Sequence, residues 1–347
     1  MMPLFRSRRQ TPPAMTLEGM LGPNGRLDEA AGMKADAPDA LCATTDGRLL
    51  FSSGSRVMSL GEWGGKPNAW ATFDAPVTAL CRSSTGVVAA GLAGGRLAVS
   101  DALGKPVDGW TLPPGRVRSV VDCVFRSEEE LLLVDCGYGE PDNLLALAAW
   151  DDEARGRVVA LNRSGETRVI ADGLHCPMGV SLDAEGGPLI SLLERASIVD
   201  AAGKVRQAGY PGYLGRLRRT PTGYAMACLS RRDPLIEFLK TERAFVAEMK
   251  LKIAPRHWIG PRTSVEFSHD FPIELGATRL FGEVKPWAPS FSYGLLVEMD
   301  DSLMPTGSAQ SRANGQRHAI CDVAVWNGDL IAVSKASGEI LNLGAGT

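Results

Sequence analysis

The chain has 347 residues, of which 44% are hydrophobic and 22% are charged, a composition typical of a globular protein with a sizeable core. The net charge of −3 and the pI near 5.9 argue against a nucleic-acid partner, because nucleic-acid-binding proteins usually carry a basic patch. No apolar run approaches the length of about 18 residues that marks a membrane-spanning helix, so we expect no membrane partner.

The chain starts with the basic stretch MMPLFRSRRQTPP, which no apolar run follows. A secretory signal needs such a run, so we expect a disordered tail over residues 1–15 and a single domain over residues 16–347. Seven cysteines, an odd number, show no CxxC pairing, and the four histidines show no ligand spacing, which argues against zinc. Without an export signal we expect reduced thiols and a cytoplasmic protein.

One pattern recurs along the chain: an apolar strand, a polar turn that often contains glycine, and further apolar strands. The turn positions are Gly47, Gly86, Glu130, Gly186, Gly223 and Gly328. Short strands repeating at intervals of about 40–55 residues predict an all-β six-bladed β-propeller, with a pair of β-sandwiches as the alternative. We expect the early stretch MTLEGMLGPNGRLDEAA to supply an outer strand to the last blade and so to close the ring.

The longest gap between turns, from Gly223 to Gly328, predicts an insertion over about residues 231–292, between blades 5 and 6. Within it, DPLIEFLKTERAFVAEMKLKI carries apolar residues at three- and four-residue spacing and predicts an amphipathic helix over residues 233–253. The helix could simply pack on the propeller. Its alternative roles are a lid over the central funnel or a homodimer contact.

Three stretches, DGLHCPMGVSLDAEGG, GYPGYLGRLRRTPTGYAMACLSRRDPLIEFL and SYGLLVEMD, resemble strictosidine synthase-like proteins. These belong to a wider group of six-bladed propellers that includes the SMP-30/gluconolactonase and paraoxonase lactonases. The resemblance covers roughly residues 36–345 and is clearest over residues 156–300. It supports the fold more strongly than the chemistry, because one fold hosts many reactions.

In the lactonase branch, the resemblance implies a central divalent cation, held by residues at the start of each innermost strand, eight residues before the turn. The same offset here selects Asp39, Thr78, Asp122, Met178, Gly215 with Arg216, and Ile320 with Cys321. Asp39 and Asp122 keep carboxylates. Met178 and Arg216 replace residues that the relatives use as ligands.

Calcium takes six to eight oxygen ligands, which a thioether and a guanidinium cannot supply. A guanidinium would also repel the cation, since two unit charges about 4 Å apart repel by about 4 kcal/mol at an effective dielectric near 20. We therefore expect no metal cofactor, with Ca²⁺ or another divalent cation as the disfavoured alternative. Arg216 is predicted to replace the cation by pairing with Asp39 and Asp122. Its alternative role is to bind a substrate anion.

In plant strictosidine synthases a glutamate of the last blade acts in acid–base catalysis, and the resemblance places Cys321 at that position. His318 and Asp322 lie close by in RHAICDVAVWNG, and His318 could transfer protons instead. Cys321 could act as a nucleophile if a neighbouring base or cation lowered the pKa of its thiol. A structural histidine and a buried thiol are the competing interpretations.

Two further residues are candidates for binding substrate. Tyr138 lies where the third blade opens into a loop, so it could line the mouth of the channel or simply belong to a turn. Glu194 lies near the cavity by analogy with the relatives, and it could be a buried acid or form an ion pair with Arg195.

Three functions remain open on the sequence. The first is a strictosidine synthase-like, metal-independent enzyme that uses acid–base residues of the central funnel on a small molecule. The second is a metal-dependent lactonase or esterase, in which Asp39 and Asp122 still hold a cation. The third is a propeller without catalytic activity that binds a metabolite or a protein.

Overall fold

The computed structural model describes residues 15–139, 144–255, 258, 260, 279–280, 283–284, 293–312 and 315–346. The predicted tail lies outside this range except for Met15, as does much of the second half of the predicted insertion. Within the described residues, no helix has the length and apolar character needed to cross a membrane.

Six antiparallel sheets form the blades, and the first three follow one another along the chain. Blade 1 contains β2 (Leu41–Ala43), β3 (Leu49–Ser53), β4 (Arg56–Leu60) and β5 (Asn68–Thr72). Blade 2 contains β6 (Val77–Arg82), β7 (Val88–Leu92) and β8 (Arg96–Ser100). Blade 3 contains β9 (Asp122–Ser127), β10 (Glu130–Asp135), β11 (Gly156–Asn162) and β12 (Thr167–Leu174).

The last three blades have four strands each. Blade 4 contains β13 (Pro177–Leu182), β14 (Pro188–Leu192), β15 (Ser197–Val199) and β16 (Val205–Ala208). Blade 5 contains β17 (Gly212–Thr220), β18 (Gly223–Arg231), β21 (Gly294–Met299) and β22 (Pro305–Ser311). Blade 6 contains β23 (Ile320–Trp326), β24 (Asp329–Ser334), β25 (Glu339–Ala345) and β1 (Ala31–Lys34).

The innermost strands β2, β6, β9, β13, β17 and β23 contact one another in that order, and β23 returns to β2, so the ring is closed. The prediction of a six-bladed propeller is confirmed. The turns after several of these strands use the predicted glycines: Gly47 and Gly86 have φ values of +82° and +95°, which glycine adopts without steric cost. Layers of buried apolar side chains lie between neighbouring blades, such as the cluster of Leu50, Val57, Leu80 and Val88 between blades 1 and 2.

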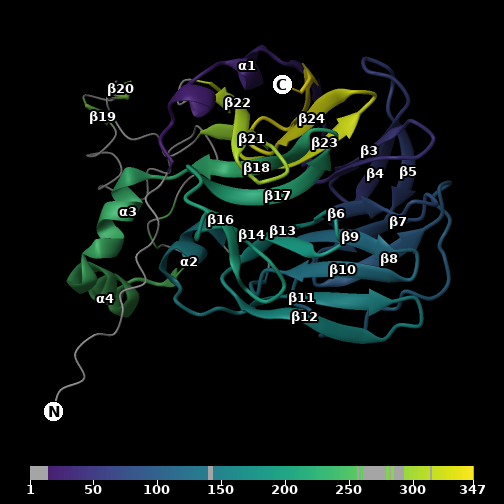
Figure 1. Ribbon diagram of the computed structural model, residues 1–347, viewed down its shortest axis with the longest axis horizontal. Helices are drawn as coiled ribbons and strands as arrows, with labels where there is room; N and C mark the ends of the chain where they lie inside the picture. Colours follow the sequence, from purple (N-terminus) through teal and green to yellow (C-terminus); the bar gives the residue numbers. More distant parts are fainter. Residues whose placement is uncertain are drawn as a thin grey trace.

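Blade 6 takes its outermost strand from the start of the chain, since β1 pairs with β25. This strand begins where the stretch predicted to supply it ends. The stretch itself forms the short helices η1 (Gly19–Leu21) and α1 (Arg26–Glu29), which pack against β22 of blade 5. There the Gln310 side chain donates a hydrogen bond to the Leu21 carbonyl at 2.7 Å. The N-terminal segment therefore joins blade 5 as well as blade 6 (Figure 1).

The insertion lies within blade 5, between β18 and β21, rather than between blades 5 and 6, because β21 returns to pair with β18. Over the stretch where one helix was predicted, the described residues form two: α3 (Pro234–Thr241) and α4 (Arg243–Lys252). The chain breaks between them at Glu242, whose ψ of 78° is not helical. The insertion also contains the short pair β19 (Arg279–Leu280) and β20 (Glu283–Val284).

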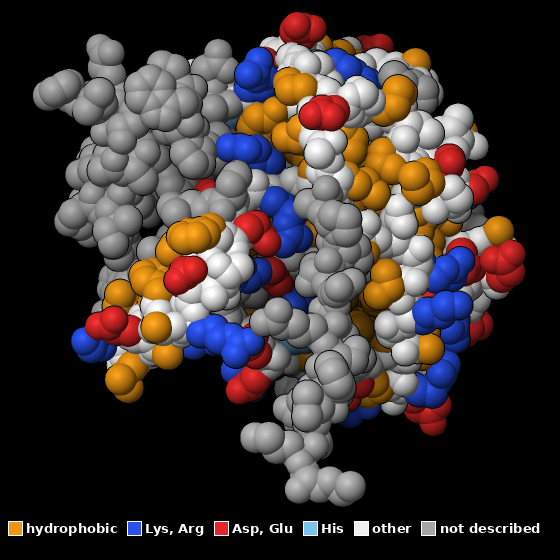
Figure 2. Space-filling model, turned by 60° about the vertical axis from the view of Figure 1, so that its left-hand side comes forward, with side chains coloured by type: hydrophobic (Ala, Val, Ile, Leu, Met, Phe, Trp, Pro, Cys, Tyr) orange, Lys and Arg blue, Asp and Glu red, His pale blue; other side chains and the backbone are white. Residues whose placement is uncertain are grey.

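A further helix, α2 (Leu144–Trp150), follows β10 in blade 3 and was not predicted. Its end packs against the insertion through a cluster of Ala149, Trp150, Ile236 and Met249. Helices α2, α3 and α4 consequently lie together on one side of the sheets (Figure 1). Hydrophobic side chains also remain exposed on the insertion (Figure 2), notably Phe238 and Leu251.

Candidate functional site

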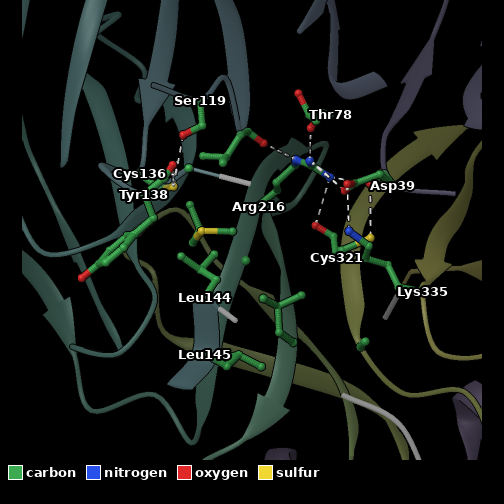
Figure 3. Close-up of a pocket in the computed structure, with 16 residues that line it drawn as sticks. Asp39, Thr78, Ser119, Cys136, Tyr138, Leu144, Leu145, Arg216, Cys321 and Lys335 are labelled. Atoms are coloured by element: carbon green, nitrogen blue, oxygen red, sulfur yellow. Dashed lines mark hydrogen bonds and ion pairs between the residues drawn. The ribbon is translucent and has the colours of Figure 1, made fainter. Parts of the chain in front are cut away.

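A cavity of about 380 Å³ opens at the ring axis, on the side that carries α2. Its walls are mainly apolar and include Val121, Met178 and Leu229, with Leu144 and Leu145 contributed by α2. Polar groups lie in two places (Figure 3). Asp39, Thr78, Arg216 and Lys335 lie on one side, and Ser119, Cys136 and Tyr138 lie on the other. Among the described residues that line the cavity, none comes from α3 or α4.

Arg216 extends from β17 to the axis, where its guanidinium meets the backbone of four other blades. Its Nε donates to Val121 O at 2.9 Å, and its Nη1 donates to Asp39 O at 2.5 Å and to Cys321 O at 3.4 Å. Its Nη2 donates to Thr78 O and, at 3.0 Å, to Asp39 Oδ1. All five N–H donors of the guanidinium are therefore used within the protein.

Three carboxylates surround the same guanidinium. Asp39 Oδ1 lies 3.0 Å from Nη2, Asp322 Oδ2 lies 3.5 Å from Nη1, and Asp122 Oδ1 lies 3.7 Å from Nε. Burial alone would lower the pKa of Arg216, but these carboxylates outweigh it and raise the pKa. The residues that the sequence analysis grouped around Arg216 thus lie together in the structure, and Arg216 is charged at any physiological pH.

Blade 4 approaches β17 closely at Gly179, which has no side chain. A Cβ atom on Gly179 of β13 would lie 2.7 Å from the Cα atom of Arg216, closer than Cβ contacts occur in proteins. Glycine at this position therefore lets blades 4 and 5 approach each other where Arg216 turns toward the axis.

Arg218 is a second cation near the axis that the sequence analysis missed, and its side chain is 17% exposed. It lies two residues beyond Arg216 on β17, so both side chains project to the same face of the strand. Its guanidinium binds both oxygens of Asp122 at 2.7 Å, and its Nε lies 3.0 Å from Asp322 Oδ1. Both carboxylates have no exposed side-chain surface. The alternation Arg216–Leu217–Arg218 was the signal that could have revealed it.

Asp122 and Asp322 are consequently structural partners at the axis. Asp122 does not line the cavity, where its neighbour Val121 does, and it also accepts a hydrogen bond from the Val180 amide at 2.9 Å. Asp322 accepts one from the Leu41 amide at 2.9 Å. Burial raises the pKa of Asp322, although Arg218 and Arg216 act in the opposite direction. The buried Asp122 side chain does not reach the cavity, so the structure does not favour the catalytic role predicted for it.

Lys335 forms the second ion pair of Asp39, with Nζ 2.8 Å from Oδ2. Burial acts to raise the pKa of Asp39, but Lys335 and Arg216 outweigh it and hold the pKa below its usual value. Asp39 in turn raises the pKa of Lys335. The side chains of Lys335 and Asp39 are 47% and 21% exposed, so this pair, unlike the buried Arg216, can contact a ligand. Sequence reasoning had no signal for Lys335, which is distant from Asp39 along the chain.

Thr78, Met178 and Cys321 line the cavity, as their place in the repeat suggested. Thr78 Oγ1 donates to Val120 O at 2.6 Å, which leaves the oxygen free to accept. The Cys321 thiol lies 3.2 Å from Asp39 O, and burial raises its pKa. Because a thiol is a nucleophile only as the thiolate, this environment does not favour the nucleophilic role predicted for Cys321.

Tyr138 lines the cavity on the side opposite Asp39, as Figure 3 shows. Its hydroxyl donates to Asp151 Oδ2 at 2.9 Å, and the Arg155 guanidinium lies 5.9 Å from the ring centroid. Burial is the main cause that raises the pKa of this phenol. The aromatic ring is therefore held in one orientation beside α2.

His318 and Glu194, also predicted for the site, do not line the cavity. His318 is fully buried, its Nε2 lies 2.9 Å from Arg312 O, and burial lowers the pKa of the imidazole. Glu194 forms ion pairs with Lys240 of α3 and with Arg195. The structure thus places His318 in the interior and Glu194 at the contact between blade 4 and the insertion.

The residues at the axis do not fit a divalent cation. Arg216 occupies the axial position and draws the carbonyl oxygens of Val121, Asp39, Thr78 and Cys321 toward its own N–H groups. Across the described part of the chain, no group of three or more His, Cys, Asp or Glu residues is placed to hold a metal ion. An oxygen-coordinated cation there would have to displace the Arg216 guanidinium, whose N–H donors are all hydrogen-bonded.

The sequence matches no protein-family model and no curated protein. Solved structures of similar fold include two gluconolactonase-type proteins. One is a structural-genomics target assigned to the gluconolactonases, with a TM-score of 0.56, 11% identity, and coverage of 90% of this chain and 91% of that chain. The other is a gluconolactonase from Xanthomonas campestris, with a TM-score of 0.53, 11% identity, and coverage of 92% and 91%. At this identity the similarity shows the fold alone: the chain is a six-bladed β-propeller of the kind found in gluconolactonases.

Proposed function

We propose that the central cavity binds a small, mostly apolar molecule that carries an ester or lactone group, and that the protein hydrolyses it without a divalent cation. The observation that carries the proposal is the Asp39–Lys335 pair. It places an ionised carboxylate and an ammonium 2.8 Å apart in a cavity whose other walls are mainly apolar. Arg216 supports this arrangement but has no free donor for a ligand.

Each charged group has a distinct role in the proposed reaction. Lys335 donates a hydrogen bond to the substrate carbonyl oxygen and stabilises the negative charge that develops there. Asp39 accepts a proton from water as the water oxygen bonds to the carbonyl carbon. The ester C–O bond then breaks and the leaving alkoxide takes up that proton, which gives an acid and an alcohol from an ester, or a hydroxy acid from a lactone. Because the pKa of Asp39 is low, it is a weak base, so we expect slow turnover.

The apolar walls select the substrate. Met178, Leu229 and the two leucines of α2 would surround the hydrophobic part of the molecule and exclude bulk water. The gluconolactonases of similar fold support a lactone as the first substrate class to test. The amine–aldehyde condensation of strictosidine synthases is less well supported, because Cys321 stands where those enzymes have their catalytic glutamate.

The test measures hydrolysis of a panel of lactones and aryl esters in EDTA and with added Ca²⁺ or Zn²⁺, together with the metal content of the purified protein. We expect turnover that EDTA does not reduce and that Asp39→Asn and Lys335→Met each lower at least about tenfold. Asp74→Asn is the matched control, because Asp74 forms an exposed ion pair with Arg96 and does not line the cavity. Stoichiometric metal with EDTA-sensitive turnover would restore the metal-dependent lactonase.

A second candidate is a propeller that binds a metabolite without transforming it. The observation that favours it is the mutual neutralisation of Asp39 and Lys335, which leaves neither group with the pKa near neutrality that suits acid–base catalysis. A panel compound that raises the melting temperature but is not turned over would support this candidate and contradict catalysis.

A further inference from the structure

A second cavity, of about 420 Å³, adjoins the central cavity on its Tyr138 side. The two cavities share Tyr138 and Gly139 as lining residues. Helix α2 also lines both, through its first two residues in the central cavity and through Leu147 and Trp150 in the second. Helix α4, which does not reach the described lining of the central cavity, contributes Lys250 to the second. The second cavity therefore lies between blade 3 and the insertion.

Neighbouring residues of blade 3 face the two cavities. Ser119 and Cys136 line the central cavity (Figure 3). The residues next to them, Arg118 and Gly137, line the second cavity. The buried Asp135 carboxylate holds both segments, because it accepts hydrogen bonds from the Arg118 amide at 3.1 Å and from the Gly137 amide at 3.0 Å. The backbone at Arg118 is therefore fixed next to the central cavity.

Most of the charged groups that line the second cavity are already paired. Asp151 Oδ2 lies 3.3 Å from Arg155 Nη2, and Glu153 Oε2 lies 2.9 Å from the same nitrogen. Lys250 Nζ lies 3.5 Å from Asp152 Oδ2, on a side chain that is almost fully exposed. These groups largely neutralise one another and leave little charge for a ligand.

Arg118 is the exception. Within the described part of the chain, no carboxylate lies within 4 Å of its guanidinium, and its side chain makes one long hydrogen bond, from Nη1 to Gly137 O at 3.5 Å. Most of its five N–H donors are thus available to a ligand, and a guanidinium matches the two oxygens of a carboxylate. The described lining holds three cations and two carboxylates, so it favours a ligand group with a single negative charge.

We propose that the second cavity binds a carboxylate of the same molecule whose ester or lactone group lies beside Asp39 and Lys335, and that Arg118 recognises this carboxylate. The inference rests on the proposed function of the central cavity. It narrows the substrate class to esters or lactones whose apolar chain ends in a carboxylate. The chain passes the ring of Tyr138, whose hydroxyl already donates to Asp151 and has no further proton to offer.

The experiment measures binding by isothermal titration calorimetry. The ligands are the mono-anilides of linear dicarboxylic acids, from adipic to dodecanedioic acid, and the methyl esters of these anilides. We expect the unaltered protein to bind the best-fitting acid at least about fivefold more tightly than its methyl ester, because only the acid pairs with a guanidinium. In Arg118→Met this ratio should fall to about one, and Arg118→Lys, which keeps the charge without the planar fork, should retain part of it. Arg96→Met is the matched control, because Arg96 forms an exposed pair with Asp74 and lines neither cavity.

Equal binding of acid and methyl ester at every chain length, or binding of neither, would overturn the proposal, as would an Arg118→Met protein that keeps the preference. The comparison on the unaltered protein decides even if a variant does not fold. Failure of the proposed function gives a different result. Hydrolysis of neutral lactones without a preference for the acid contradicts the carboxylate site alone, whereas a preference for the acid in a protein that hydrolyses nothing contradicts the hydrolysis alone.

Discussion

Arg216 and Arg218 lie two residues apart on one strand and carry the same charge, but the protein neutralises them differently. Arg216 directs its N–H groups mainly at backbone carbonyls from four blades and at Asp39, beside the cavity. Arg218 directs its N–H groups mainly at the carboxylates of Asp122 and Asp322. One arginine therefore satisfies dipoles that water could also satisfy, and the other balances buried charges that water cannot reach.

The largest expected effect follows from breaking the Arg218 contacts. In Arg218→Met, Asp122 and Asp322 lose their main counter-ion in the interior, so we expect the free energy of unfolding to fall by about 3–5 kcal/mol. Urea unfolding at pH 7 measures the change. The matched control is Arg219→Met on the same strand, whose pair with Asp301 is exposed, so it should lose less than about 1 kcal/mol. Equal losses in the two variants would contradict the comparison.

The loss in Arg218→Met should depend on pH. Burial already raises the pKa of Asp322, and removing Arg218 raises it further, so the folded variant binds a proton more tightly than the unfolded chain does. Protonation then favours folding, and the difference from the unaltered protein should shrink as the pH falls from 7 toward 5. A difference that stays constant over this range would show that the two carboxylates are not left charged.

A smaller effect is expected for Arg216→Met. The carbonyl oxygens of Val121, Asp39, Thr78 and Cys321 lose a donor, but water from the cavity can replace it, so we expect a loss of about 1–3 kcal/mol. The melting temperature of the variant measures it, and the same protein tests whether the vacated axis binds Ca²⁺. A loss as large as that of Arg218→Met would contradict the distinction between dipoles and charges.

The smallest change in stability is expected for Asp39→Asn, at the cavity side of the axial cluster. Asp39→Asn removes a carboxylate whose pKa is lower in the folded than in the unfolded state. The ionised carboxylate therefore stabilises the fold at pH values above the unfolded pKa, near 3.9, and this stabilisation is lost as the pH falls through the folded pKa. We expect a difference of about 1–2 kcal/mol that is constant from pH 5 to pH 9 and shrinks below pH 4. A difference that grows on acidification would reverse the sign assigned to Asp39.

The sequence predicted the blades because hairpin turns and alternating apolar residues are local signals. The eight-residue offset from those turns also selected Asp39, Thr78, Met178 and Gly215, which line the cavity together with Arg216, the residue after Gly215. In blade 3 the same offset selected Asp122, whereas the lining residue is Val121, since a shift of one residue moves a side chain from one face of a strand to the other.

What the sequence did not predict depends on contacts between distant segments. Lys335 reaches Asp39 across nearly the whole chain, and the return of β21 to β18 places the insertion inside blade 5. The helix α2 is a short apolar run, LLALAAW, which periodicity alone does not distinguish from a buried strand. Its leucine and alanine content was the only indication of a helix.

The pairing of β1 with β25 also bears on how the protein reaches its native state. Blades 1 to 4 are each built from one continuous segment and can form as soon as that segment leaves the ribosome. Blade 6 must wait for its last strands, and until then β1 is an edge without a partner. Contacts of such long range slow folding, so we expect ring closure to be a late, rate-limiting step of folding.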